Sequence, residues 1–204
     1  MIPKIIHYCW FGGNPLPKSA QKCIRSWKKH FPDYEIKEWN EQNFNVNSNR
    51  YTQEAYERKK YAFVSDYARF YILYQYGGVY FDTDVEVIKP MDDLLEKGAF
   101  MGIEQAESNL GVNPGLGFAV PAHLPIFKEI LDHYNSITFV DENGIQIPGT
   151  IVKHTTEILK EKGTQALEIL ADKGDNTIDD KSKERISELL IETFNFDKDG
   201  KCNF

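Results

Sequence analysis

The apolar positions in the first part of the chain predict strands and helices in alternation. Residues 2–10 form a nearly continuous apolar run, which is typical of a buried strand. Residues 34–39 alternate between apolar and polar positions and predict a second, shorter strand. Between these strands, apolar residues recur at helical spacing, and Pro17 stands at the expected first helical position. We therefore expect a helix that ends near His30.

The most apolar segment of the chain is a helix-like run over residues 61–76. A helix is expected to begin near Thr52 and, after a break, to continue through this run. The run is apolar on nearly every side, so we expect it to be buried. Ser65 is a candidate helix cap, and Gly77 supplies the helix stop.

The rest of the chain shows shorter strands and amphipathic helices. Helices are expected over residues 91–98, 123–137, 150–163 and 181–194, a strand over 99–104, and a glycine-interrupted strand or loop over 111–120. This order favours an α/β fold in which helices cover the faces of a sheet. In such folds, ligand sites lie beyond the carboxyl ends of the strands.

Three carboxylates recur at every second position of the stretch over residues 77–86. The apolar residues on either side predict a strand, which would place Asp82, Asp84 and Glu86 on one side together with Tyr80. Such crowding of like charge is unfavourable unless a cation lies nearby. Carboxylate oxygens suit Mg²⁺ or Mn²⁺, which also bind the phosphate oxygens of a substrate. A solvated strand face is the alternative interpretation.

The charge distribution argues against nucleic acid as a partner. The chain has 204 residues and a formal net charge of −7. Residues 1–69 contain 12 Lys and Arg against 7 Asp and Glu, whereas residues 70–204 contain 12 against 24. A globally acidic protein binds nucleic acid poorly, because phosphate contacts require clustered basic residues.

The cysteines and the hydropathy indicate a cytoplasmic protein. Cys9, Cys23 and Cys202 are odd in number and lack the spacing of metal ligands, so we expect reduced thiols. No stretch approaches the about 18 apolar residues of a membrane-spanning helix. Peripheral contact with the inner face of the membrane stays open.

Two further features are candidates for ligand binding. Asp66 and Arg69 lie three positions apart in the apolar helix and therefore on one face of it. They form either a buried structural ion pair or a clamp on the hydroxyls of a ligand. Trp10 follows the first strand beside a glycine turn, where it is either a core residue or a platform for stacking on a flat base.

Two motifs, in this order, resemble the DXD-containing sugar transferases of glycosyltransferase family 32. They are IPKIIHYCWFGG at residues 2–13 and SDYARFYILYQYGGVYFDTDVE at residues 65–86. The family includes capsule and lipopolysaccharide transferases and the Golgi initiating mannosyltransferase, and glucosylating toxins share a related core. The resemblance spans about residues 2–120. It implies a GT-A-type (Rossmann-like) fold, an α/β architecture with a mixed sheet flanked by helices.

The resemblance also implies a role for individual residues. Trp10 would stack on the nucleotide base, and Tyr80 would lie near the base and ribose. Asp66 and Arg69 would hold the hydroxyls of the donor sugar. The remaining implied residues are Asp82 at the sugar, ribose and metal, Asp84 as a direct metal ligand, and Asn113 beside the donor sugar or acceptor. Among these, Asp82, Asp84, Asp66 and Arg69 are the candidate catalytic residues.

The implied activity is that of a metal-dependent, retaining hexosyltransferase. It would use a UDP- or GDP-sugar donor with Mn²⁺ or Mg²⁺, and a saccharide or glycolipid acceptor in the synthesis of surface polysaccharide. We expect a single domain over residues 1–204, with a nucleotide-sugar and metal-binding core over 1–120 and a mainly helical acceptor side over 121–204. Front-side attack is expected, with a covalent intermediate through Glu104 or Asp66 as the alternative.

The sequence also departs from the family pattern. Relatives carry a C-terminal His and Trp segment that completes the metal shell, whereas the last tryptophan here is Trp39, and His154 is a candidate substitute. One alternative is therefore a catalytically impaired nucleotide-sugar-binding remnant that lacks the C-terminal lid. A second is a Mg²⁺-dependent phosphatase of the haloacid dehalogenase type, since residues 174–180 imitate its later acidic motif, although Glu86 departs from its first.

Overall fold

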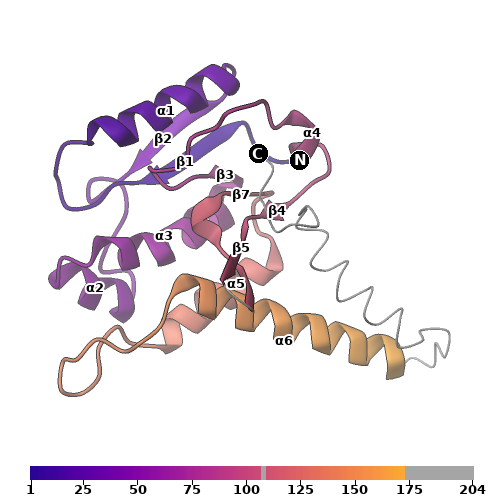
Figure 1. Ribbon diagram of the computed structural model, residues 1–204. Helices are drawn as coiled ribbons and strands as arrows, with labels where there is room; N and C mark the ends of the chain where they lie inside the picture. The colour runs from indigo at the N-terminus through magenta and orange to yellow at the C-terminus, as the bar shows by residue number, and fades with distance from the viewer. Residues whose placement is uncertain (107–108, 173–204) are drawn as a thin grey trace.

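A mixed five-stranded sheet lies at the centre of the protein (Figure 1). The computed structural model describes residues 1–106 and 109–172. In sheet order, the strands are β2 (Glu35–Trp39), β1 (Ile5–Cys9), β3 (Gly78–Tyr80), β7 (Phe118–Val120) and β4 (Phe100–Met101). β1 is parallel to both β2 and β3, whereas β7 is antiparallel to β3 and β4. A separate antiparallel pair consists of β5 (Ile103–Ala106) and β6 (Asn109–Val112).

Helices cover both faces of this sheet, as the sequence predicts. Their bounds are α1 Lys18–His30, α2 Arg50–Glu57, α3 Tyr61–Tyr76, α4 Asp92–Leu95, α5 Pro125–Ser136 and α6 Ile151–Asp172, with a 3₁₀ turn η1 at Pro114–Leu116. α6 is longer than expected, and the predicted break between α2 and α3 is present. The predicted helix over residues 181–194 and the acidic motif over 174–180 lie outside the described residues.

The strands bury one core on each face because their side chains alternate. In β3, Val79 packs on the side of α1, where Cys23, Ile24 and Trp27 are buried. The next residue, Tyr80, packs on the opposite side, in the core that contains the apolar residues of α3 and α5. Both side chains have no exposed surface. The α/β fold with a mixed sheet flanked by helices is confirmed.

The turn from α3 into β3 depends on two glycines. Gly77 has a φ of +63°, and a Cβ atom there would lie 2.6 Å from the backbone nitrogen of Ala122. Its N–H donates to the carbonyl of Leu73, which ends α3 as predicted. Ser65, by contrast, does not cap α3: it lies inside the helix, and its hydroxyl donates to the carbonyl of Tyr61.

The predicted strand over residues 77–86 is wrong in its second half. β3 ends at Tyr80, and the chain then turns, with the N–H of Val85 donating to the carbonyl of Asp82 at 3.0 Å. We call residues 82–85 the acidic turn. Aspartate is favoured at the first position of such turns. Asp82 and Asp84 therefore project from a turn at the carboxyl end of β3, not from one face of a strand.

Candidate active site

The acidic turn lies where the carboxyl ends of two parallel strands meet. β1 and β3 run side by side in parallel, with Ile6 opposite Val79 and His7 opposite Tyr80. Trp10 directly follows β1, and Asp82 follows β3, so both residues lie at the same edge of the sheet. This edge is the usual position of ligand sites in open α/β sheets.

The side chain of Arg69 joins α3 to the acidic turn. Its Nη1 lies 3.1 Å from Oδ2 of Asp82, and its Nη2 lies 3.1 Å from Oδ1 of Asp66. Its Nε donates to the carbonyl of Ser65 at 3.1 Å. The Arg69 side chain is only 4% exposed, so it contributes a fixed positive charge beneath Asp82.

The structure confirms the first interpretation of the Asp66–Arg69 pair, and the clamp on ligand hydroxyls stays a prediction. The two residues do form the buried ion pair that the helical spacing suggests. The same guanidinium also reaches Asp82, which the sequence did not predict. The cation that the crowded carboxylates require is therefore supplied in part by Arg69.

Tyr80 supports the same carboxylate from below. Its hydroxyl donates to Oδ1 of Asp82 at 3.1 Å, and the guanidinium carbon of Arg69 lies 4.9 Å from the centre of its ring. Burial raises the pKa of the Tyr80 hydroxyl well above its ordinary value. Because Tyr80 is fully buried, it orients Asp82 and offers no exposed ring face on which a base can stack.

The loop around η1 closes in on Asp82 from the other side. A Cβ atom on Gly115 would lie 2.5 Å from Oδ2 of Asp82, 3.0 Å from Oδ1 of Asn113 and 3.5 Å from Nη1 of Arg69. Asn113 Oδ1 accepts from the N–H of Gly115 at 2.8 Å. The fold therefore brings Asn113, Asp82 and Arg69 around one point, although they come from three separate elements.

Gly115 is the site residue that sequence reasoning missed. Its missing side chain allows the loop backbone to approach Asp82, and its carbonyl accepts from the N–H of Asp82 at 3.4 Å. The sequence signal was the run NPGLG, in which two glycines flank Leu116. Glycine in such a run often marks a close backbone approach, but the run does not identify the residue it approaches.

The electrostatics of the site centre on Asp66. Burial raises the pKa of the Asp66 carboxyl to about 7, against the lowering effect of Arg69, and the charge of Asp82 raises it further. Arg69 stays charged, because the carboxylates around it hold the pKa of its guanidinium high. The site thus contains a permanent cation between two carboxylates that differ in exposure.

The two aspartates of the acidic turn are accessible and suit a divalent cation. Asp84 is exposed, and the side chain of Asp82 is 34% exposed. No group of three or more His, Cys, Asp or Glu side chains that could hold a metal ion occurs in the described residues. Two carboxylates nevertheless fit Mg²⁺ or Mn²⁺, because these ions commonly bind one or two carboxylates together with substrate phosphates and water. The donor set therefore fits a metal that binds together with a phosphorylated ligand.

Trp10 is half-buried at the edge of the core beside α1. Its indole N–H donates to the carbonyl of Asn14 at 2.6 Å, and its backbone N–H donates to the carbonyl of Trp39 at 2.8 Å. These bonds fix Trp10 beside the carboxyl ends of β1 and β2. The adjacent Gly12 is also fixed, because its N–H donates to Glu41.

Two other candidates lie elsewhere or cannot be assigned. His154 in α6 pairs with His133 in α5, with 3.0 Å between Nε2 of His133 and Nδ1 of His154. Burial lowers the pKa of both imidazoles. This pairing occupies Nδ1 of His154 and Nε2 of His133, and the role of His154 at a metal stays a prediction. The backbone of Glu104 lies in β5, and its side chain lies outside the described residues.

A comparison with family models matches residues 17–101 to the glycosyltransferase sugar-binding region that contains the DXD motif. The acidic turn supplies that motif as Asp82, Thr83 and Asp84. The resemblance to family 32 drawn from the sequence is thereby confirmed.

Two curated relatives of the chain are yeast proteins whose names specify a mannosyl group and an inositol-containing ceramide. Inositol phosphoceramide mannosyltransferase 1 of Schizosaccharomyces pombe is 29% identical over 140 residues, covering 63% of this chain and 42% of the relative. Mannosyl phosphorylinositol ceramide synthase SUR1 of Saccharomyces cerevisiae is 31% identical over 150 residues, covering 69% and 37%. The chain thus spans roughly two fifths of the length of these two relatives.

A solved structure of the PaToxG glycosyltransferase superposes with a TM-score of 0.60 at 16% identity, covering 95% of this chain and 84% of that one. This likeness establishes the GT-A fold expected from the sequence. The fold agrees with the position of the acidic turn at the carboxyl end of β3. Residues 17–101 of the chain therefore match the family of glycosyltransferase sugar-binding regions that contain the DXD motif.

Proposed function

We propose that the protein is a metal-dependent, retaining glycosyltransferase that moves a hexosyl group from a UDP- or GDP-sugar to an acceptor hydroxyl. The observation that carries this proposal is the contact of Arg69 with Asp82 at the carboxyl end of β3. It fixes one carboxylate of the acidic turn and leaves Asp84 exposed for a ligand. Charge that is held in place before the reaction begins contributes strongly to the rate enhancement of many enzymes.

The donor would lie along the edge of the sheet, with its base near Trp10 and its sugar near Arg69. Half-buried indole rings are suitable platforms for a base. Asp66 would accept hydrogen bonds from sugar hydroxyls, and Asn113 would contact the sugar or the acceptor. We assign Tyr80 a supporting role through Asp82, because it is buried beneath that carboxylate.

Asp84 and Asp82 would hold Mn²⁺ or Mg²⁺. When bound, the ion neutralises charge on the diphosphate leaving group. The residues of the chain do the rest. Arg69 keeps Asp82 oriented and offsets part of the negative charge of the acidic turn. Because Gly115 has no side chain, the backbone of the η1 loop lies close against Asp82.

The reaction would proceed by front-side attack. The acceptor hydroxyl oxygen forms a bond to the anomeric carbon while the bond from that carbon to the diphosphate oxygen breaks. The hydroxyl proton passes to the departing diphosphate, so that the products are the glycoside and the nucleoside diphosphate. The anomeric configuration is retained, because the acceptor hydroxyl attacks the same face of the sugar from which the diphosphate departs.

We propose a glycolipid or lipid-linked saccharide as the acceptor. The names of the relatives specify a mannosyl group and an inositol-containing sphingolipid, which supports a lipid acceptor and places GDP-mannose first among donors to test. α5 and α6 would form the acceptor side. No helix in the described part of the chain combines the length and apolarity of a membrane span. In keeping with a lipid acceptor, we propose peripheral contact with the membrane, in the setting of surface polysaccharide or glycolipid synthesis.

The test is a panel of UDP- and GDP-sugars with Mn²⁺ or with EDTA, followed by thermal unfolding and by release of nucleoside diphosphate. A donor at 100 times its Kd stabilises the folded protein by about 2.7 kcal/mol, and this raises the Tm of a protein of this size by about 5–10 °C. We expect such a shift with Mn²⁺ and none with EDTA, together with slow donor hydrolysis. No shift with any donor in the presence of Mn²⁺ would contradict the proposal.

The same panel separates the two alternatives. Metal-dependent donor binding without turnover would indicate a binding remnant instead of an enzyme. Release of phosphate from simple phosphomonoesters would indicate the phosphatase, which the family match over residues 17–101 and the GT-A fold argue against.

A further inference from the structure

We propose that the exposed basic face of α1 docks the protein on an anionic phospholipid surface. A groove of about 410 Å³ lies between α1 and the segment that follows the acidic turn. We call it the basic groove, and its lining includes Lys22, Arg25, Lys29, His30, Glu86 and Ile88. The proposal deepens the peripheral membrane contact proposed above by naming the surface that makes it.

The charge of α1 is opposite to that of the protein as a whole. The helix contains five Lys and Arg residues and no Asp or Glu, whereas the complete chain has a net charge of −7. Lys22, Arg25 and Lys29 recur at intervals of three and four residues, so they project from one side of the helix. A negatively charged surface would therefore attract this face and repel most of the rest of the molecule.

The cations of the groove are available to a partner. Arg25 and Lys29 are exposed, and neither forms an ion pair with a residue in the described part of the chain. Lys22 pairs with Glu86 at 2.7 Å, but both side chains are well exposed, at 64% and 42%. Exposed ion pairs of this kind contribute little free energy, so Glu86 competes only weakly with a membrane phosphate for Lys22.

An exposed apolar residue stands beside these cations. Ile88 lines the groove and is 70% exposed, one of the most exposed large hydrophobic side chains of the described residues. A free phosphate ion gains nothing from an isoleucine, whereas a membrane surface presents acyl chains directly below its phosphates. Basic residues joined to an apolar contact are typical of interfacial binding, so the groove favours a phospholipid surface over a soluble anion.

The groove is connected to the acidic turn by hydrogen bonds. The indole N–H of Trp27 donates to the carbonyl of Val85 at 2.8 Å, and the N–H of Val87 donates to the hydroxyl of Ser26 at 2.9 Å. α1 therefore holds the segment that carries both Asp84 and Ile88. Docking through α1 would keep the acidic turn at a fixed distance from the lipid surface, where a lipid-linked acceptor would be presented.

The test measures co-sedimentation of the full chain with vesicles of phosphatidylcholine, with and without phosphatidylglycerol. We expect binding to the mixed vesicles only, and binding that weakens as salt rises. Arg25→Gln should lower the partition coefficient about fivefold, and Arg25→Gln with Lys29→Gln about 30-fold, since each basic residue near an anionic surface contributes about fivefold. Ile88→Ser should also weaken binding to the mixed vesicles.

Lys153→Gln is the matched control. It removes the same charge from α6, which lies on the opposite side of the molecule from α1 (Figure 1). We expect it to leave the partition unchanged. The proposal would be overturned if Lys153→Gln lowered the partition coefficient as much as Arg25→Gln does, because binding would then reflect net charge. Full binding by the variant that combines Arg25→Gln and Lys29→Gln would also overturn it, because another surface would then bind the vesicles.

Competition separates the membrane from a soluble anion. Inorganic phosphate should release the protein from vesicles no better than chloride at the same ionic strength. Selective release by phosphate would overturn the proposal and indicate a discrete phosphate pocket. Vesicle binding needs neither donor nor metal, so its failure leaves the donor assay of the proposed function unaffected, and failure of that assay leaves this result interpretable.

Discussion

Nη1 of Arg69 lies 3.1 Å from Oδ2 of Asp82, so a residue of the central helix holds the first carboxylate of the acidic turn. The same guanidinium binds Asp66 within α3. One buried cation thus links the core of the fold to the place where a donor would bind.

Removal of this cation should destabilise the protein strongly. Arg69→Ala leaves Asp66 buried without its partner, and loss of one member of a buried pair costs about 3–5 kcal/mol. Urea unfolding measures the change. Lys128→Ala is the control, because the side chains of Lys128 and its partner Asp132 are 55% and 56% exposed, and surface pairs contribute at most about 1 kcal/mol. Equal effects of the two variants would contradict the central place of Arg69.

Gly115→Ala should impair donor binding more than stability. The added methyl group would lie 2.5 Å from Oδ2 of Asp82, so either the loop or the carboxylate must move. We expect weaker metal-dependent donor binding, measured by titration calorimetry, with folding still cooperative in urea. Unchanged donor affinity in this variant would show that the contact with the acidic turn is not needed.

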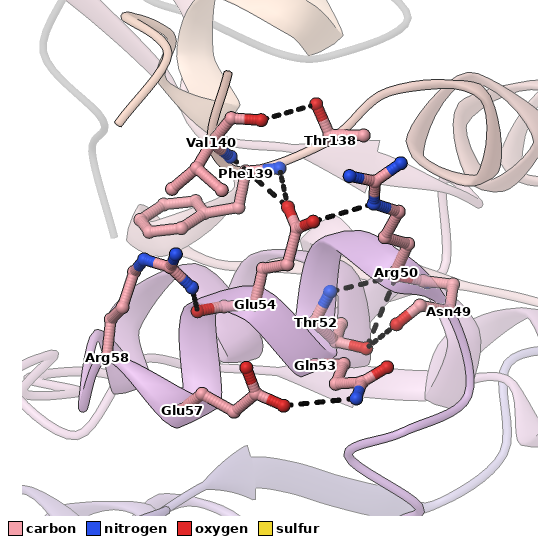
Figure 2. A network of polar contacts seen from close by, with 10 residues as sticks. All are labelled: Asn49, Arg50, Thr52, Gln53, Glu54, Glu57, Arg58, Thr138, Phe139 and Val140. Atoms are coloured by element: carbon pink, nitrogen blue, oxygen red, sulfur yellow. Dashed lines mark hydrogen bonds and ion pairs between the residues drawn. The ribbon is translucent and has the colours of Figure 1, made fainter. Parts of the chain in front are cut away.

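Glu54 in α2 should contribute more to the free energy of unfolding than its neighbour Glu57 (Figure 2). Its Oε2 accepts from the N–H groups of Phe139 and Val140 at 3.0 and 3.2 Å, whereas Glu57 accepts, among the residues that the structure describes, only from the exposed amide of Gln53. Glu54→Ala leaves two backbone donors without their acceptor, which costs about 1–3 kcal/mol.

Glu57→Ala on the same helix is the matched control, with an expected change within about 0.5 kcal/mol in urea unfolding. Hydrogen exchange should also report faster exchange at Phe139 and Val140 in Glu54→Ala alone. Identical exchange in the two variants would mean that Glu54 does not hold this segment to α2.

Acid should destabilise the fold through His7. Its Nδ1 accepts from the indole of Trp39, its Nε2 faces the carbonyl of Gly77, and burial lowers its pKa to about 4 from 6.5. As pH falls from 6.5 towards 4, the unfolded chain takes up a proton that folded His7 does not, so stability is lost in this window. The loss amounts to about 3 kcal/mol.

The check is urea unfolding of His7→Gln across the same range. Glutamine does not titrate, so the variant should have a smaller slope of unfolding free energy against pH than the natural protein. The same slope in both would show that carboxylates, and not His7, cause the acid sensitivity.

Local patterns in the sequence were sufficient to predict the elements around the site. The run over residues 61–76 is apolar on nearly every side, and this alone identifies a buried helix, which the structure packs against both the sheet and α5. Gly77 marks its end because a positive φ is required there. Motif order was sufficient to predict the fold and the family.

The interior arrangement of the site was not predictable, because it depends on contacts between distant residues. A strand pattern through Asp82 and Asp84 takes no account of Arg69, which binds Asp82 from another element. The burial of Tyr80 and the approach of Gly115 likewise depend on how α3 and the η1 loop pack. These are tertiary effects that override the local preference for a strand.

The most direct test of the account is calorimetric titration of Asp84→Asn with Mn²⁺ and a nucleotide-sugar donor. Asp84 is exposed and its replacement should leave the unfolding free energy within about 0.5 kcal/mol of the natural value. Asp93→Asn, another exposed aspartate, is the control. We predict that Asp84→Asn loses metal-dependent donor binding while Asp93→Asn keeps it. Full metal-dependent binding by Asp84→Asn would contradict the assignment of the acidic turn as the metal and donor site.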